Sequence, residues 1–298
     1  MEFSLLISTR NRLPELKKTI RDIEQMIGSR AEILICDDHS TDGTYNYLKK
    51  NCPNFRIFRN SEQMGYLYTR NFLMSKVSTK YAMSLDDDAG LVSKNPLEKC
   101  KEYFDRNPYC GVLAFKIFWG TKMPSNLDFE ETSIKVKGFV GCGHIWRMDA
   151  WKSIPNYPEW FKFYGEENFA SFHLFKKGWD ILYAPEILVQ HRVDNIERKR
   201  DNDFYTRRKN GLKADWFNIL LFYPSNNATR LISYSIFKQI HKAWNQRDLK
   251  ALMILPKSII EVLSNLKNII RGRNQLTKDQ FRRWKDLPNT KIYWSPKA

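Results

Sequence analysis

The sequence has no long hydrophobic run and few cysteines. None of its apolar stretches reaches the roughly 18 residues that a membrane-spanning helix needs, and its N-terminus has neither the flanks nor the length of a secretory signal. The five cysteines are an odd number without CxxC spacing, which argues against a disulfide framework and against a thiolate zinc site. We therefore expect a cytoplasmic protein.

The sequence also lacks low-complexity segments and internal repeats. Of its 298 residues, 42% are hydrophobic and 28% are charged, which is typical of globular proteins and not of disordered chains. This length corresponds to one large domain or two small ones.

Acidic residues are scarce in the last third of the chain. Residues 195–298 carry 22 Lys and Arg against 8 Asp and Glu, whereas residues 1–194 carry 27 against 25. The formal net charge of +16 is therefore concentrated in a C-terminal region that also contains many aromatic residues. Such a surface favours an anionic partner. Anionic lipid head groups, nucleic acid and a phosphorylated lipid substrate all meet this requirement, and charge alone does not distinguish them.

Residues 1–194 alternate between short apolar runs and segments with helical spacing. This alternation predicts an α/β fold with a mostly parallel central sheet and flanking helices. The expected strands lie at 3–8, 31–36, near 55, at 81–85, at 112–118 and, as a final pair of short strands, within 180–190. The expected helices lie at 13–23, 40–48, 66–77, 97–104 and 166–177.

The pattern changes after residue 195 to amphipathic helices. One helical face carries Leu231, Tyr234, Phe237, His241 and Trp244, and a second carries five aliphatic residues, Ile259, Val262, Leu263, Leu266 and Ile270. Two interpretations of this helical tail stay open. The apolar faces pack on the rest of the chain or on a second subunit, or they also attach the protein to a membrane surface.

Acidic residues cluster at three places, and two of these places are strand ends. Asp37 and Asp38 follow the second strand, Asp86 to Asp88 follow the fourth, and Glu166 with Glu167 precedes a helix. Ligands of open α/β sheets bind beyond the carboxyl ends of the strands, and like charges gathered there are tolerated when a cation neutralises them. A hard divalent ion, which bridges carboxylates to substrate phosphates, would fit Asp88.

Four motifs occur in order and at suitable spacing: ISTRNR, ICDDHSTDGT, MGYLYTRN leading to SLDDDAGLVSKNPL, and FYGEENFASFHLFKKGWDILYAPEILVQH. Together they resemble the motifs of family 2 glycosyltransferases of the GT-A fold. The later segment YTRRKNGLKADWFNILLFYP resembles the rhamnosyltransferase-like branch. The resemblance implies a Rossmann-like GT-A catalytic domain at 1–195, with a nucleotide-sugar half at about 1–95 and an acceptor half at about 96–195. A basic helical region follows at 196–298.

The resemblance also implies a donor site with a divalent metal, Mn²⁺ or Mg²⁺. Asp88, as the last acid of the family's DxD signature, and His191 would bind the metal. Ser8 and Asp38 would recognise a uracil or thymine base, Asp86 would hold the ribose, and Arg70 would meet the diphosphate. The remaining nucleotide-binding residues would be Thr9, Arg10, Gly65 and Asp87.

On the acceptor side, the resemblance makes Glu167 the general base, in place of the Asp of the family's Glu–Asp pair. Glu166 would grip the acceptor or orient the loop. Three further residues, Gly141, Cys142 and Gly143, would let the backbone approach the acceptor closely.

The expected activity is metal-dependent, inverting transfer of a hexose or deoxyhexose from a UDP- or dTDP-sugar. The acceptor would be a hydroxyl of a glycan or lipid-linked glycan in cell-surface polysaccharide synthesis. The enzyme would be cytoplasmic, or peripheral on the cytoplasmic face of the membrane, and a homo-oligomer stays open.

Two other function classes are weaker. A nucleotidyltransferase usually has a Gly-rich loop after its first strand, whereas ISTRNRLPE contains no glycine. A nucleic-acid-binding protein would combine the basic tail with a recognisable nucleic-acid module, and the sequence has none. We therefore expect no nucleic-acid partner.

Overall fold

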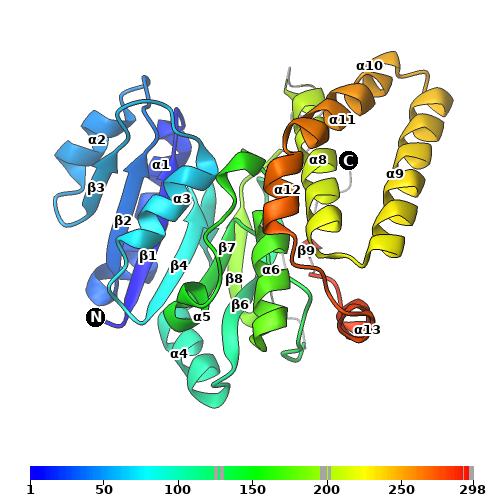
Figure 1. Ribbon diagram of the computed structural model, residues 1–298. Helices are drawn as coiled ribbons and strands as arrows, with labels where there is room; N and C mark the ends of the chain where they lie inside the picture. Colours follow the sequence, from blue (N-terminus) through cyan, green and yellow to red (C-terminus); the bar gives the residue numbers. More distant parts are fainter. Residues whose placement is uncertain (124–126, 128–130, 195–199, 201–202, 291, 295–298) are drawn as a thin grey trace.

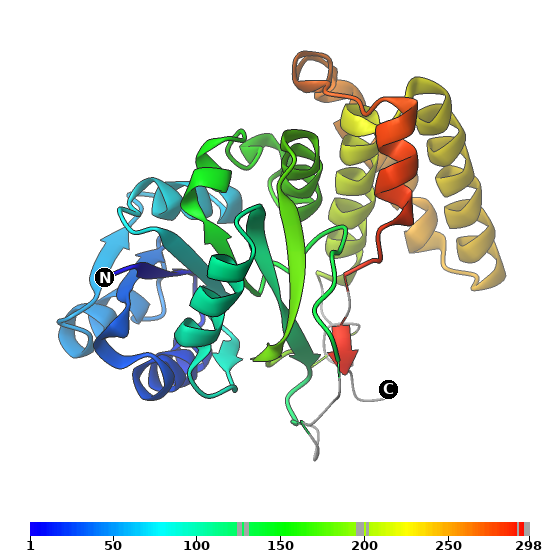
Figure 2. The ribbon, with the colours of Figure 1, turned by 90° about the horizontal axis from the view of Figure 1, so that it is seen from below.

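The computed structural model describes residues 1–123, 127, 131–194, 200, 203–290 and 292–294. The described chain forms a nine-stranded sheet with helices on both faces, and a group of C-terminal helices lies beside it (Figures 1 and 2). The predicted α/β class, the flanking helices and the helical C-terminal region are thereby confirmed.

The sheet is dominated by parallel pairs. Its strand order is β3-β2-β1-β4-β7-β6-β8-β5, and β9 pairs with β6. Neighbours from β3 to β4 are parallel, as are β6 with β8 and β6 with β9, whereas β7 and β5 run antiparallel to their neighbours. The strands are β1 Phe3–Thr9, β2 Glu32–Asp37, β3 Arg56–Arg59, β4 Tyr81–Asp86, β5 Ala89–Leu91, β6 Cys110–Trp119, β7 Gly143–Arg147, β8 Asp180–His191 and β9 Ile292–Trp294.

Two hydrophobic cores cover the two faces of the sheet. The first core contains Leu16 and Ile20 of α1 and Leu97 of α4, and the second contains Leu67 of α3 and Phe172 of α6. Strands buried on both faces are nearly continuously apolar, which explains the runs FSLLIS and AEILIC. The helices of this part are α1 Leu13–Met26, α2 Thr44–Asn51, α3 Tyr66–Ser75, α4 Pro96–Arg106, α5 Met148–Lys152 and α6 Glu166–Lys177.

The C-terminal helices share the second core with the sheet domain. Phe217 and Phe222 of α8 pack in the same cluster as Phe169 and Phe172 of α6. The helices are α8 Phe204–Phe222, α9 Ser225–Asn245, α10 Leu249–Leu252, α11 Ile254–Ser264, α12 Leu266–Gly272 and α13 Lys278–Asp286. The predicted domain boundary at residue 195 lies outside the described residues.

The structure corrects two expectations about strands. Residues 180–190 form one strand, β8, and not a pair. Ala184 pairs with Phe115 while Leu188 pairs with Lys116, so the intervening residues bulge out and the chain continues in the same direction. The second correction is β9, a short strand in a region expected to be helical.

The parallel strands bring the acidic clusters to one edge of the sheet. Ser8 of β1 lies opposite both Cys36 of β2 and Asp86 of β4. The carboxyl ends of these three strands therefore lie side by side, and the segments that follow them can line one cleft.

None of the described helices combines the length and the apolar character that crossing a membrane requires.

An ion pair anchors α11 to α8. Nζ of Lys213, a buried residue, lies 2.7 Å from Oε2 of Glu261, and Lys209 contacts the same carboxylate. Burial favours the protonated form of Glu261, but hydrogen bonds from both lysines outweigh it and lower the pKa. Lys213 thus depends on one anionic partner.

We expect Glu261→Gln to lower the free energy of unfolding by about 1–3 kcal/mol, because the buried Lys213 loses that partner. Chemical denaturation of both proteins measures the difference. Glu102→Gln, which removes an exposed helical pair with Arg106, is the control and should cost less than about 0.5 kcal/mol. Equal losses in the two variants would contradict the anchoring role.

Candidate active site

A cleft of about 310 Å³ opens at the carboxyl edge of β1, β2 and β4. Nine of the predicted site residues line it: Ser8, Thr9, Arg10, Asp38, Gly65, Asp86, Asp87, Asp88 and His191. The structure therefore brings together residues from β1, the β2 end, the α3 start, the β4 end and the β8 end. The five other lining residues are Arg12, Gln63, Tyr66, Thr69 and Phe163.

Asp86, Asp88 and His191 form a group that could hold a metal ion. One ligand atom from each residue lies within 4.8 Å of the others. Nε2 of His191 is 3.1 Å from Oδ1 of Asp88 and 4.0 Å from Oδ2 of Asp86. Oδ1 of Asp88 is buried and accepts no hydrogen bond from the described residues. Two carboxylates and an imidazole fit a divalent ion such as Mn²⁺ and leave positions for phosphate oxygens and water.

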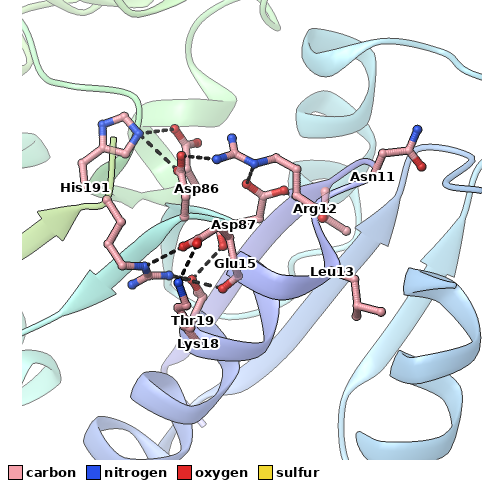
Figure 3. A network of polar contacts seen from close by, with 12 residues as sticks. Asn11, Arg12, Leu13, Glu15, Lys18, Thr19, Asp86, Asp87 and His191 are labelled. Atoms are coloured by element: carbon pink, nitrogen blue, oxygen red, sulfur yellow. Dashed lines mark hydrogen bonds and ion pairs between the residues drawn. The ribbon is translucent and has the colours of Figure 1, made fainter. Parts of the chain in front are cut away.

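Arg12 offsets the charge of this acidic group (Figure 3). Its Nη2 atom lies 2.7 Å from Oδ2 of Asp88, and its Nε atom lies 3.6 Å from Oδ1 of Asp87. Burial alone would raise the pKa of Asp88, but His191 and Arg12 lower it to about 2. Burial raises the pKa of Asp87 to about 7, although Arg12 and the Thr9 hydroxyl oppose this shift. Asp88 is therefore the more acidic of the two neighbours.

Arg192, which follows β8, fixes the end of that strand to α1. Arg192 contacts Glu15 at 3.0 Å and Asp22 at 3.2 Å, and it also contacts Thr19. Thr19 donates in turn to the backbone carbonyl of Asp87 (Figure 3). This network holds His191, which precedes Arg192, beside the acids of β4.

Asp38 shapes the turn before α3. Its Oδ1 atom accepts hydrogen bonds from Asn60 and from the backbone N–H of Met64, and its Oδ2 atom accepts one from the N–H of Gly65. Gly65 has a φ of 97°, a conformation that glycine adopts without strain. Asp38 lines the cleft, and its role in base recognition stays a prediction.

Arg70 lies on α3, as expected, and its side chain is buried. It is only 4% exposed, it does not line the cleft, and its Nη2 atom donates to Asp86 and to the carbonyl of Gly141, both at 2.7 Å. Its guanidinium also stacks on Tyr66. The packing of α3 turns the side chain toward these partners, and contact of Arg70 with the diphosphate stays a prediction.

Glu166 and Glu167 lie on the far side of Arg70 from the acids of β4. Oε1 of Glu166 is 3.9 Å from Nη1 of Arg70, and Glu166 is almost fully buried. Burial and the neighbouring Glu167 raise the pKa of Glu166 well above its ordinary value, and burial also raises that of Glu167. Because Glu167 is less buried, it is the member of the pair that can more readily act as a base.

Gly141 contacts Glu167, and the Gly141–Gly143 segment does not line the cleft. The N–H of Gly141 donates to Oε1 of Glu167 at 3.1 Å, and a Cβ atom at this position would lie 2.5 Å from that oxygen. Cys142 is buried, and Gly143 begins β7. Gly141 is thus required for the close approach of Glu167, whereas acceptor contact by these three residues stays a prediction.

The sequence predicted no role for three residues that line the cleft, Arg12, Tyr66 and Phe163. Arg12 lies in the ISTRNR motif, directly after the first strand, so its position near the strand ends was visible. Tyr66 donates to Asp86 at 3.1 Å, and its ring contacts Phe163. No local signal indicates these contacts, because the partners are far apart in the sequence.

Comparisons with known proteins agree with this geometry. A family model described as Glycosyl transferase family 2 matches residues 4–164, which is more than half of the chain. An uncharacterized protein of Haemophilus influenzae is 28% identical over 160 residues, which cover 48% of this chain and 86% of the relative.

Solved structures show the same fold. TarS 1–349 from S. aureus in complex with UDP-GlcNAc has a TM-score of 0.59 and 17% identity, over 92% of this chain and 82% of that one. GalNAc-T7 with UDP, GalNAc and Mn²⁺ has a TM-score of 0.60 and 15% identity, over 76% of this chain and 48% of that one. The mannosyltransferase PcManGT from Pyrobaculum calidifontis, with GDP-Man and Mn²⁺, has a TM-score of 0.57 and 13% identity, over 89% of this chain and 75% of that one.

The chain spans less than half of two of the structures that it matches, 40% of a longer TarS chain and 48% of GalNAc-T7.

We expect Arg12→Gln to bind Mn²⁺ more tightly than the parent protein when no nucleotide is present. The guanidinium competes with a cation for Asp88, so its removal should raise Mn²⁺ affinity on the order of tenfold. Calorimetric titration with Mn²⁺ alone measures this change.

The control is Arg10→Gln, which removes the same charge from another cleft residue that forms no ion pair with a described residue. It should change the affinity much less. Weaker or unchanged Mn²⁺ binding by Arg12→Gln would show that Arg12 does not compete for Asp88.

Proposed function

Because the chain belongs to glycosyltransferase family 2, we propose that it transfers a sugar from a UDP- or dTDP-sugar to an acceptor hydroxyl with inversion at the anomeric carbon. The reaction would depend on a divalent metal. The transferred group is proposed to be a hexose or deoxyhexose, as in the rhamnosyltransferase-like branch that the sequence resembles.

The observation that supports this proposal is the convergence of Asp86, Asp88 and His191 at a cleft that Asp38 also lines. These residues come from three strand ends that are far apart in the sequence. A metal-binding group at the carboxyl edge of an α/β sheet suits a nucleoside diphosphate, whose phosphates need a cation and whose base and ribose need polar partners.

In the proposed reaction, cleavage of the bond between the anomeric carbon and the phosphate leaves additional negative charge on the nucleoside diphosphate. A bound divalent ion supplies Lewis-acid stabilisation of this charge. Asp86, Asp88 and His191 would hold the ion, and Arg12 would add positive charge beside the leaving group.

The acceptor hydroxyl is a poor nucleophile at neutral pH and needs a base. Glu167 would accept its proton while the oxygen attacks the anomeric carbon on the face opposite the diphosphate. Arg70 would keep Glu166 and Asp86 in position, because its guanidinium lies between them.

We further propose that the acceptor is a glycan or lipid-linked glycan of cell-surface polysaccharide synthesis, and that the enzyme works on the cytoplasmic side of the membrane. The basic C-terminal region supports an anionic, lipid-linked acceptor. A panel of nucleotide-sugars, assayed for transfer with and without EDTA, tests the donor and the metal dependence together. Transfer that persists in EDTA would contradict the metal role.

We expect Asp88→Asn to lose Mn²⁺-dependent binding of UDP and dTDP, because the group of potential metal ligands loses one carboxylate. Calorimetric titration with each nucleotide and Mn²⁺ measures the loss. Asp105→Asn, which alters an exposed acid of α4, should bind like the parent. Nucleotide binding that Mn²⁺ strengthens equally in Asp88→Asn and the parent would remove Asp88 from the metal site.

We expect Glu167→Gln to keep its affinity for the nucleotide-sugar and to lower kcat by about 100- to 10,000-fold, the usual contribution of a general base. Donor binding and transfer are measured on the same preparation. Asn168→Ala, which changes the next residue of α6, should retain most of the turnover. A wild-type kcat in Glu167→Gln would assign the base to another residue.

The raised pKa values of the glutamate pair predict the pH dependence of transfer. Because a general base must be ionised, kcat should rise with pH along an acid limb whose apparent pKa lies above 4.5, the ordinary value for glutamate. A pH–rate profile at saturating donor measures this limb. An acid limb with an apparent pKa at or below 4.5 would contradict the role of a buried Glu167 as the base.

A further inference from the structure

Large apolar side chains are exposed mainly on the C-terminal helices. Among the described residues, 15 such side chains are exposed, and 11 of them lie between Tyr234 and Ile270. Scattered exposed apolar residues are normal, but such a concentration marks an interaction surface. The amphipathic faces predicted from the sequence are therefore only partly covered by the rest of the chain.

The clearest apolar face runs along α10 and α11. Met253 joins the two helices in right-handed helical conformation, so that four exposed residues form one stripe at helical spacing. We call Leu249, Met253, Ile260 and Leu263 the α10–α11 stripe; they are 57–76% exposed. The other side of these helices is buried in a small core with α8, through Ile254 and Leu255 against Leu212 and Trp216.

The end of α9 adds an aromatic residue to this region. Trp244 is 75% exposed and lies five residues before Leu249. Figure 1 shows α9 joined to α10 at the edge of the molecule that lies away from the sheet. Tryptophan is favoured where an apolar ring meets a polar interface.

The charges around the stripe are almost all positive. Residues 225–272 contain eight Lys and Arg and two Asp and Glu. Both acids face α8, since Asp248 contacts Arg208 and Glu261 contacts Lys213. None of the eight basic residues forms an ion pair with a described residue. The surface thus presents unpaired cations next to exposed apolar groups.

A pocket of about 360 Å³ lies directly beside the stripe. Lys209, Lys250 and Lys257 line it, together with Met253 and Tyr205. Lys250 and Lys257 place amino groups next to apolar side chains, which suits a lipid phosphate above its acyl chains.

We propose that the α10–α11 stripe and Trp244 insert into the surface of an anionic membrane, with Lys250 and Lys257 at the level of the lipid phosphates. A second copy of the chain fits this face less well, because it would bring two surfaces with a net charge of +6 each together. This docking deepens the proposed function, since it brings the enzyme to a lipid-linked acceptor, but it needs neither donor nor turnover.

The test is cosedimentation of the full chain with vesicles of equal parts phosphatidylcholine and phosphatidylglycerol, or of phosphatidylcholine alone. We expect binding to the anionic vesicles that high salt weakens. Lys250→Gln with Lys257→Gln should weaken binding about 30-fold, since each lysine near an anionic surface contributes about fivefold. Met253→Ser with Ile260→Ser should weaken it at least about tenfold, because less apolar area leaves water.

Two control variants carry the same changes elsewhere. Lys49→Gln with Lys50→Gln removes two exposed lysines of α2, and Tyr109→Ser removes an exposed aromatic residue of the sheet domain. Both should bind like the parent, and thermal unfolding should show that all variants fold. Equal binding by all variants, or equal binding to both kinds of vesicle, would overturn the proposal.

The proposal would also be overturned if the parent protein self-associates and does not bind vesicles, and if Met253→Ser with Ile260→Ser abolishes the self-association. That outcome would assign the face to a second copy of the chain. Nucleotide binding is measured separately. A parent protein that binds nucleotide with Mn²⁺ but binds neither kind of vesicle would therefore refute the docking and leave the transferase proposal standing.

Discussion

The cleft depends on side chains that offset the charge of three consecutive acids at the end of β4. Asp86 lies at the rim, and Asp87 and Asp88 are buried, where repulsion between like charges is strong. Three nitrogen-bearing side chains approach these acids, and each comes from a different element: Arg12 precedes α1, Arg70 lies on α3 and His191 ends β8. Arg12 and His191 keep the pKa of the buried Asp88 low, at about 2, whereas burial raises that of Asp87 to about 7. The charge state of the site therefore depends on how these elements pack together.

Arg70 connects the two sides of the proposed chemistry. Its Nη2 atom contacts Asp86, in the proposed nucleotide site, and the carbonyl of Gly141, in the proposed acceptor site. Its Nη1 atom faces Glu166. Because the guanidinium is buried and always charged, the proton affinity of the glutamate pair depends on how strongly Asp86 draws on the same cation. Binding of metal or nucleotide at Asp86 and ionisation of the Glu166–Glu167 pair would therefore be coupled through the Arg70 side chain.

Sequence reasoning located the edge of the sheet where the site lies, and it was less successful with individual contacts. Strand ends can be predicted, since apolar runs end where polar residues begin and parallel strands align their carboxyl ends. The ion pair of Arg12 with Asp88 joins residues 76 positions apart, and no local pattern indicates it. Arg70 was placed correctly on α3, but its inward direction follows from the packing of that helix. A helical apolar pattern likewise looks the same whether it faces a core or solvent, so the exposure of Trp244 and Leu249 became visible only in the folded chain.

Helix α8 links the exposed face of the tail to the glutamate pair. On one side, Leu212 and Trp216 pack against α11, and on another side Asn218 donates to the carbonyl of Gly165, the residue before Glu166. Gly165 has a φ of 83°, and a Cβ atom there would lie 2.8 Å from Ala214 of α8, so a side chain at this position would strain the backbone and separate α8 from the turn. Helices α10 and α11, α8 and the start of α6 thus form one packed series. If the C-terminal helices dock as proposed, the packing of these helices would fix the distance between Glu167 and the lipid surface. A lipid-linked acceptor would have to span that distance.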